Sequence, residues 1–201
     1  MTSDLVEDVR AILDSRFEAR ERAISDSRKA IRAAANGIRA LHRSAGDDAS
    51  ELIDESGHLL AGITKALEGN PELMSHAVVF DAAKEYAEAR ITQAVFSESP
   101  VPGFTELGLD PVPYLHGLGE AVGEMRRRML DMLREERLTE AETLLDEMDR
   151  IVDLLAEIDY PDGMTNGLRR TTDVSRSLVE RSRSDLTATV VQERLRQDLR
   201  D

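Results

Sequence analysis

The chain lacks cysteine and tryptophan, and only 3% of its 201 residues are aromatic. The lack of cysteine excludes disulfides, thiolate zinc sites and cysteine nucleophiles. So few aromatic rings argue against a platform on which several nucleic-acid bases stack. No apolar run approaches the roughly 18 residues of a membrane span. The first ten residues are acidic and lack the apolar stretch of a signal peptide. We therefore expect a cytoplasmic protein with no membrane contact.

Enough apolar material is present for a buried core. Apolar residues make up 41% of the chain and charged residues 33%, which is not the composition of a disordered chain. No segment alternates with the period of two that is typical of a strand. The sequence therefore predicts an all-α bundle of about six helices that forms a single domain over residues 1–201.

Apolar residues recur at helical spacing along six segments. The first segment carries one apolar stripe, whereas the third is apolar on most faces, which is typical of a buried helix. Start signals precede the third, fourth and fifth segments at Asn70-Pro71-Glu72, at Asp110-Pro111 and at the capping box Thr139-x-x-Glu142. The stripe of the first segment contains Leu13, Phe17, Ile24, Ile31, Ala35 and Ile38. The expected helices span 4–43, 48–68, 71–97, 111–136, 140–159 and 168–199.

The formal net charge is −14, which taken alone argues against a nucleic-acid ligand. The kind of basic residue matters, however. Of 26 basic residues only Lys29, Lys65 and Lys84 are lysine, and all the others are arginine. An acid-rich, lysine-poor composition is typical of proteins adapted to a very salty cytoplasm, and our hypothesis for the host is a halophilic archaeon. The negative charge would then serve solubility and say nothing about the ligand.

Two pairs of acids stand at helical spacing. Glu85 and Glu88 are three residues apart, and Glu120 and Glu124 are four apart, so each pair shares one side of its helix. Two such helices facing each other would present four carboxylates to one point, which suits Mg²⁺ or Mn²⁺. The metal could activate water and stabilise charge on a phosphoryl group. The alternative is that these are solvated acids, with Glu124 paired to an arginine one turn away.

Neighbouring residues bear on this interpretation. Glycines at 117, 119 and 123 each weaken the helix that carries Glu120, which suggests that a helix or a ligand approaches that face closely. The four histidines show no metal-ligand pairing, and His116 is more simply a solvated residue than a support for the site. Di-iron bundles and all-α nucleotide pyrophosphohydrolases fit poorly, because their motifs require other residues and spacings.

A basic stripe lies on the first predicted helix. Arg28, Arg32, Arg39 and Arg43 lie within about 60° of one another, and no acid occurs from 27 to 46. Such a stripe could bind a nucleic-acid backbone, or it could form salt bridges between helices or molecules. The arginines of the last helix are interleaved with serine and aspartate, which is typical of a solvated face.

Several short motifs, in order and correctly spaced, resemble the translin family, and most closely its catalytic branch, translin-associated factor X. Each motif alone is weak, but together they cover nearly the whole chain. At position 120 the branch typically has aspartate and this chain has glutamate. The matching blocks are Glu21-Arg22, Ser27-Arg28, Leu41-His42-Arg43, Glu85-Tyr86-x-Glu88-Ala89, Pro113-Tyr114-Leu115-x-Gly117, Gly123-Glu124-Met125-Arg126 and Gly167-Leu168-Arg169-Arg170 with Asp173.

The resemblance implies a fold of seven helices that assembles into a hollow homo-octamer with nucleic acid inside. It also implies metal-dependent endonucleolytic cleavage of single-stranded RNA, with DNA as a second candidate ligand. Two hypotheses remain open: a Mg²⁺- or Mn²⁺-dependent endoribonuclease, and a non-catalytic binder of single-stranded nucleic acid. The implied catalytic and metal-binding residues are Glu85, Glu88, Glu120 and Glu124, and the candidate nucleic-acid surface contains Arg22, Arg28, Arg32, Arg39 and Arg43.

Overall fold

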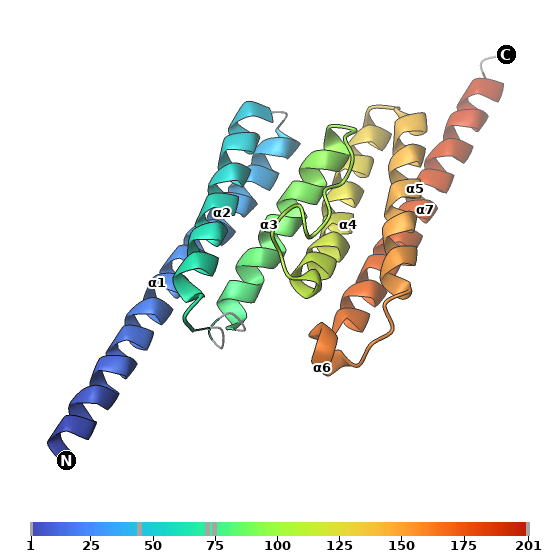
Figure 1. Ribbon diagram of the computed structural model, residues 1–201. Helices are drawn as coiled ribbons and strands as arrows, with labels where there is room; N and C mark the ends of the chain where they lie inside the picture. The colour runs from blue at the N-terminus through green and yellow to red at the C-terminus, as the bar shows by residue number, and fades with distance from the viewer. Residues whose placement is uncertain (1, 44–45, 71–72, 74–75, 200–201) are drawn as a thin grey trace.

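A computed structural model describes residues 2–43, 46–70, 73 and 76–199. These residues form seven helices and no strand, which confirms the predicted all-α fold (Figure 1). None of the helices in this described part is both long and apolar enough to span a membrane. The helices are α1 (Thr2–His42), α2 (Gly46–Leu67), α3 (Ala77–Phe96), α4 (Pro111–Arg134), α5 (Leu138–Ala156), α6 (Asp162–Thr165) and α7 (Leu168–Asp198).

The core has two parts, and α3 lies between them. Tyr86 and Ala89 of α3 pack with α1 and α2, whereas Ala87 and Ile91 pack with α4, α5 and α7. An isolated surface helix buries one stripe, but a helix between two apolar layers must be apolar on opposite sides. This arrangement explains why the apolar residues of the third predicted helix follow no single face.

Helices α3 and α4 run parallel. Phe80 near the start of α3 contacts His116 near the start of α4, and Phe96 at the end of α3 lies under Arg128 farther along α4. A parallel pair requires a connection that returns along the helix, and the proline-rich segment 97–110 fills that role (Figure 1). Asp110 caps α4 as predicted, with its side chain accepting from the amide of Val112 at 2.9 Å.

Two local predictions were wrong. The third helix begins at Ala77 and not at 71, where His76 caps it by accepting from the amide of Val78; Pro71 and Glu72 lie outside the described residues. The capping box is also wrong, because α5 begins at Leu138 and already contains Thr139. A short helix, α6, lies between the fifth and sixth predicted segments and brings the total to the seven helices that the family resemblance implies.

The apolar stripe of α1 is buried only in its second half. Ile38 belongs to the core, whereas Leu13 and Phe17 are exposed, because the N-terminal part of α1 extends beyond the other helices (Figure 1). Within this extension six large apolar side chains are exposed: Leu5, Val6, Val9, Ile12, Leu13 and Phe17.

Candidate metal and nucleic-acid site

The close contact of α3 and α4 depends on Gly117. A Cβ atom at this position would lie 2.6 Å from the carbonyl oxygen of Lys84 and 2.8 Å from the amide nitrogen of Glu88. The missing side chain therefore lets the two parallel backbones approach, which places the acids of α3 beside those of α4. The predicted close approach is correct for Gly117 and also for Gly119, which contacts α7. Gly123 has no such neighbour, since its nearest atom lies 3.9 Å away in Leu178.

Three of the four predicted acids meet in this contact. Glu85 and Glu88 of α3 and Glu120 of α4 each offer a carboxylate oxygen, and these oxygens all lie within 4.8 Å of one another. We call these three residues the acid trio. Glu88 is buried, whereas Glu85 and Glu120 are partly exposed. The buried Glu88 and the two partly exposed acids together present hard oxygen donors, the ligands that Mg²⁺ and Mn²⁺ prefer.

Lys84, to which no sequence pattern assigns a role, lies within the acid trio. Its Nζ atom is 2.8 Å from Oε1 of Glu120 and 3.5 Å from Oε1 of Glu85. Burial acts to lower the pKa of Lys84, but the hydrogen bond and charge of Glu120, with the charge of Glu85, outweigh burial and raise it. Lys84 is therefore a firmly protonated cation that pairs with two acids of the trio.

Crowding of negative charge changes the ionisation of the trio. Burial, followed by the charges of Glu85, Glu120 and Glu124, raises the pKa of Glu88 to about 8. The pKa of Glu85 is also raised, mainly by burial, although Lys84 opposes the shift. Without a further cation, Glu88 holds a proton at neutral pH. A divalent cation bound by these oxygens would stabilise the ionised carboxylates and offset both burial and repulsion, so the donor set fits a hard metal ion.

The fourth acid, Glu124, has a different partner. Its Oε2 atom lies 2.5 Å from Nε2 of His42 at the end of α1, and Arg127 is more distant at 4.0 Å. The hydrogen bond with His42 lowers the pKa of Glu124, although burial acts in the opposite direction. Glu124 therefore stays ionised, and its charge still contributes to the raised pKa of Glu88.

His42 is a residue whose role sequence reasoning missed. Its side chain is only 3% exposed, and its ring packs edge-on against Phe96 of α3. An ionised carboxylate accepts only, so Nε2 of His42 donates to Glu124. Its Nδ1 atom is buried and has no hydrogen-bond partner within the described residues. The signal was its place in the Leu41-His42-Arg43 block, but no spacing rule links position 42 to position 124.

His116 is neither solvated nor part of the acid trio. It is buried, with Nε2 2.9 Å from the carbonyl oxygen of Thr165 and Nδ1 2.9 Å from the hydroxyl of Thr171. The expectation of a solvated residue was wrong, because α6 and α7 cover this side of α4. His116 fixes the start of α7 against α4.

The predicted basic stripe of α1 lies on its exposed face. Arg39 donates to the side-chain oxygen of Asn36, and within the described residues none of the five arginines forms an ion pair. These cations are therefore free to meet an anionic ligand. All five are exposed: Arg22, Arg28, Arg32, Arg39 and Arg43.

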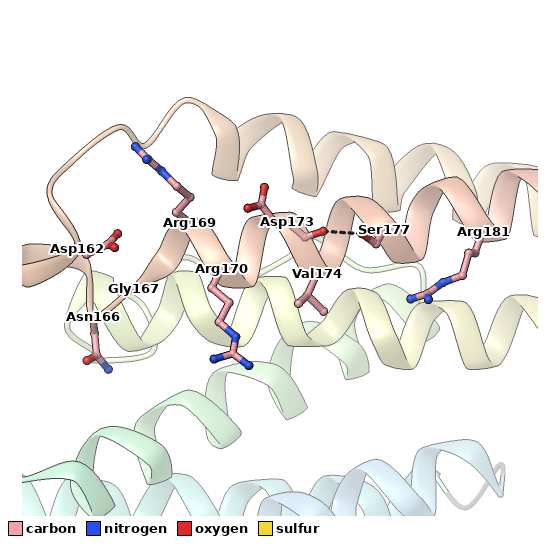
Figure 2. Close-up of a pocket in the computed structure, with 9 residues that line it drawn as sticks. All are labelled: Asp162, Asn166, Gly167, Arg169, Arg170, Asp173, Val174, Ser177 and Arg181. Carbon is pink, nitrogen blue, oxygen red and sulfur yellow. Dashed lines mark hydrogen bonds between the residues drawn. The ribbon is translucent and has the colours of Figure 1, made fainter.

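A shallow groove along α7 contains more arginines (Figure 2). Arg170 and Arg181 extend from one side of α7, whereas Arg169 points away and pairs with Asp159 at 3.4 Å. The groove also contains Asp162 and Asp173, so its charges nearly balance. It is a much weaker anionic-ligand surface than α1, in line with the predicted solvated face.

Comparison with known proteins supports the same architecture. No protein-family model matches the sequence. An uncharacterized protein of Methanocaldococcus jannaschii, MJ0175, is 28% identical over 191 residues, which cover 94% of this chain and 84% of that protein.

Solved structures match nearly the whole chain. The crystal structure of AfC3PO has a TM-score of 0.85 at 30% identity, over 93% of this chain and 97% of that chain. The structure of AfC3PO in complex with duplex RNA has a TM-score of 0.86 at the same identity and coverage. Apo-NeC3PO has a TM-score of 0.77 at 21% identity, over 94% of this chain and 96% of that chain, and shows likeness of fold alone.

Proposed function

The chain belongs to the translin family of C3PO proteins, and from this premise we propose that it is a metal-dependent endoribonuclease acting on single-stranded RNA. The observation that carries the proposal is that carboxylate oxygens of Glu85, Glu88 and Glu120 all lie within 4.8 Å of one another. Glutamate pairs at helical spacing are common, but the meeting of three acids from two helices across a glycine contact is not a feature of an ordinary solvated surface. The complete acid set also favours the catalytic, factor X-like branch of the family.

The residues present suggest a division of tasks. Glu85, Glu88 and Glu120 would hold Mg²⁺ or Mn²⁺, with Glu88 giving up its proton when the metal binds. A metal bound there supplies an activated water and stabilises charge on the phosphodiester. Glu124, kept ionised and oriented by His42, completes the catalytic set on the side of α4 that faces the end of α1.

The RNA would follow the exposed arginine face of α1. Arg22, Arg28, Arg32, Arg39 and Arg43 offer backbone-binding cations that are not committed to acids of the described chain. AfC3PO has been solved with duplex RNA, so binding should be compared for single-stranded RNA, duplex RNA and single-stranded DNA. The non-catalytic alternative is favoured by one observation, the ion pair between Lys84 and Glu120, which engages one acid of the trio.

We further propose that copies of the chain form a hollow homo-octamer in the cytoplasm. The extension of α1 exposes six large apolar side chains on one helix, and their contact with water does not stabilise a monomer. A second copy would cover this surface. Size measurement by light scattering should therefore show a large oligomer, and L13E/F17E should dissociate it.

The decisive experiment measures cleavage of a labelled single-stranded RNA with and without Mg²⁺ or Mn²⁺. It should be run at high salt, because the composition fits a halophilic host. Wild-type protein should cleave only with metal, and Glu124→Gln should bind RNA but not cleave it. If both proteins leave RNA intact under every metal while shifting it on a native gel, the chain is a binder whose acids serve another purpose.

The arginine surface is tested separately. R28E/R32E should weaken binding of every RNA sequence by about tenfold or more, because backbone contacts carry no base information. R134E/R150E makes the same charge change on exposed arginines of α4 and α5 and should alter affinity by less than about threefold. Equal effects of the two variants would indicate a general charge effect and remove α1 from the binding surface.

A further inference from the structure

Lys84 differs from the other lysines of the chain. Lys29 and Lys65 lie on exposed helix surfaces, whereas the Lys84 side chain is 18% exposed and directed into the acid trio. The chain otherwise uses arginine for nearly every cation. A lysine at this one enclosed position therefore calls for a physical reason.

The reason lies in the shape of the two cations. The lysine ammonium is a compact point charge on a flexible stem, whereas the guanidinium of arginine is a broad planar fork. The backbones of α3 and α4 touch at Gly117, so the carboxylates cannot move apart to admit a larger group. An ammonium 2.8 Å from Glu120 and 3.5 Å from Glu85 takes up oxygens that a divalent cation would need.

We propose that Lys84 is the resident counter-cation of the acid trio and competes with the divalent metal for Glu120 and Glu85, so that it sets the metal affinity of the site. The inference rests on the proposed metal site but not on cleavage of RNA. Lys84 stabilises the trio while no metal is bound. Metal binding requires its ammonium to leave these two carboxylates, which its flexible stem and partial exposure allow.

The first test uses metal-free protein. K84M should melt several degrees below wild type, because Glu85 and Glu120 then lie close together without a cation between them. The double variant K84M/E120Q should melt close to wild type, because it also removes the charge of the acid that Lys84 pairs with. K65M is the matched control on the exposed surface of α2. Equal melting temperatures for K84M and K65M would overturn the counter-cation role.

The second test measures Mn²⁺ binding by calorimetry, without RNA. K84M should bind Mn²⁺ about tenfold more tightly than wild type, since a positive charge next to the metal has been removed, whereas K65M should stay within twofold. K84R, which keeps the charge, should not gain affinity. If wild type binds Mn²⁺ and K84M binds it no more tightly, the competition is wrong while the proposed metal site stands. If no variant binds Mn²⁺, both the competition and the metal dependence of the proposed function fail.

Discussion

The acid trio and Glu124 are adjacent parts of one predicted site, and the structure treats them in opposite ways. In the trio, burial and neighbouring acids raise the pKa of Glu88 to about 8, and one lysine balances the charge. At Glu124, a hydrogen bond with a buried histidine lowers the pKa. The charge of a carboxylate therefore depends on the partners that tertiary packing supplies. Residue type and helical spacing, which the two pairs share, do not determine it.

The strongest test of this comparison removes the ionisable group of Glu88. The folded chain binds the proton of Glu88 more tightly than the unfolded chain does, so ionisation costs folding free energy as pH rises from 4.5 towards 8. Glu88→Gln avoids this cost. We expect it to be more stable than wild type by about 3 kcal/mol at pH 9 and nearly equal to it at pH 4.5.

Urea unfolding at the two pH values measures the effect. Glu124→Gln is the matched control and should behave oppositely: the lowered pKa of Glu124 makes its ionised form stabilising, so this variant should lose stability at pH 9 relative to wild type. A stability gain for Glu88→Gln that is the same at both pH values would show that Glu88 does not titrate in this range.

The second test disturbs the contact that brings the trio together. Gly117→Ala places a methyl group within 2.6 Å of the Lys84 carbonyl oxygen, so α3 and α4 must separate. We expect a loss of about 2 kcal/mol in the free energy of unfolding. Gly123→Ala lies on the same helix with its nearest atom 3.9 Å away, so it should be neutral or gain up to about 1 kcal/mol from better helix propensity. Equal losses at both positions would contradict the role given to the glycine contact.

The third and smallest effect concerns the partner of Glu124. His42→Ala removes a hydrogen bond to an ionised carboxylate and the ring that contacts Phe96, which should cost about 1–2 kcal/mol in unfolding free energy at neutral pH. The pKa of Glu124, followed by NMR of its side-chain carboxyl carbon, should rise. His42→Gln keeps a donor and should retain part of both effects. If the pKa of Glu124 is unchanged in His42→Ala, the hydrogen bond with His42 is not what lowers it.

The general fold could be predicted from local patterns. Helical spacing of apolar residues, the proline cluster and the Asp110 cap are properties of contiguous residues. They identified six of the seven helices, with every end except the start of α3 within three residues. The errors at Ala77 and Thr139 arose because cap motifs of a few residues occur by chance and packing decides between nearby starts. The exposed half of the α1 stripe could not be foreseen either, since periodicity shows a face but not what covers it.

The candidate site was predicted only in part. Glu85, Glu88 and Glu120 were found because each pair is visible in the sequence, and two paired helices bring them together. Lys84 and His42 were missed as partners because 36 residues separate Lys84 from Glu120 and 82 separate His42 from Glu124. No local rule connects positions so far apart.

Local patterns alone establish that the chain is helical, where its acids pair along each helix and that arginines line one face of α1, because these are properties of residues a few turns apart. Packing of the helices decides which acids share a site, which partner each acid has and which arginines stay unpaired. The parallel direction of α3 and α4 and their contact at Gly117 bring Lys84 into the acid trio, and the length of α1 brings His42 to the fourth acid. Charge, proton binding and metal competition depend on distances across the fold, and those distances exist only after the helices have packed.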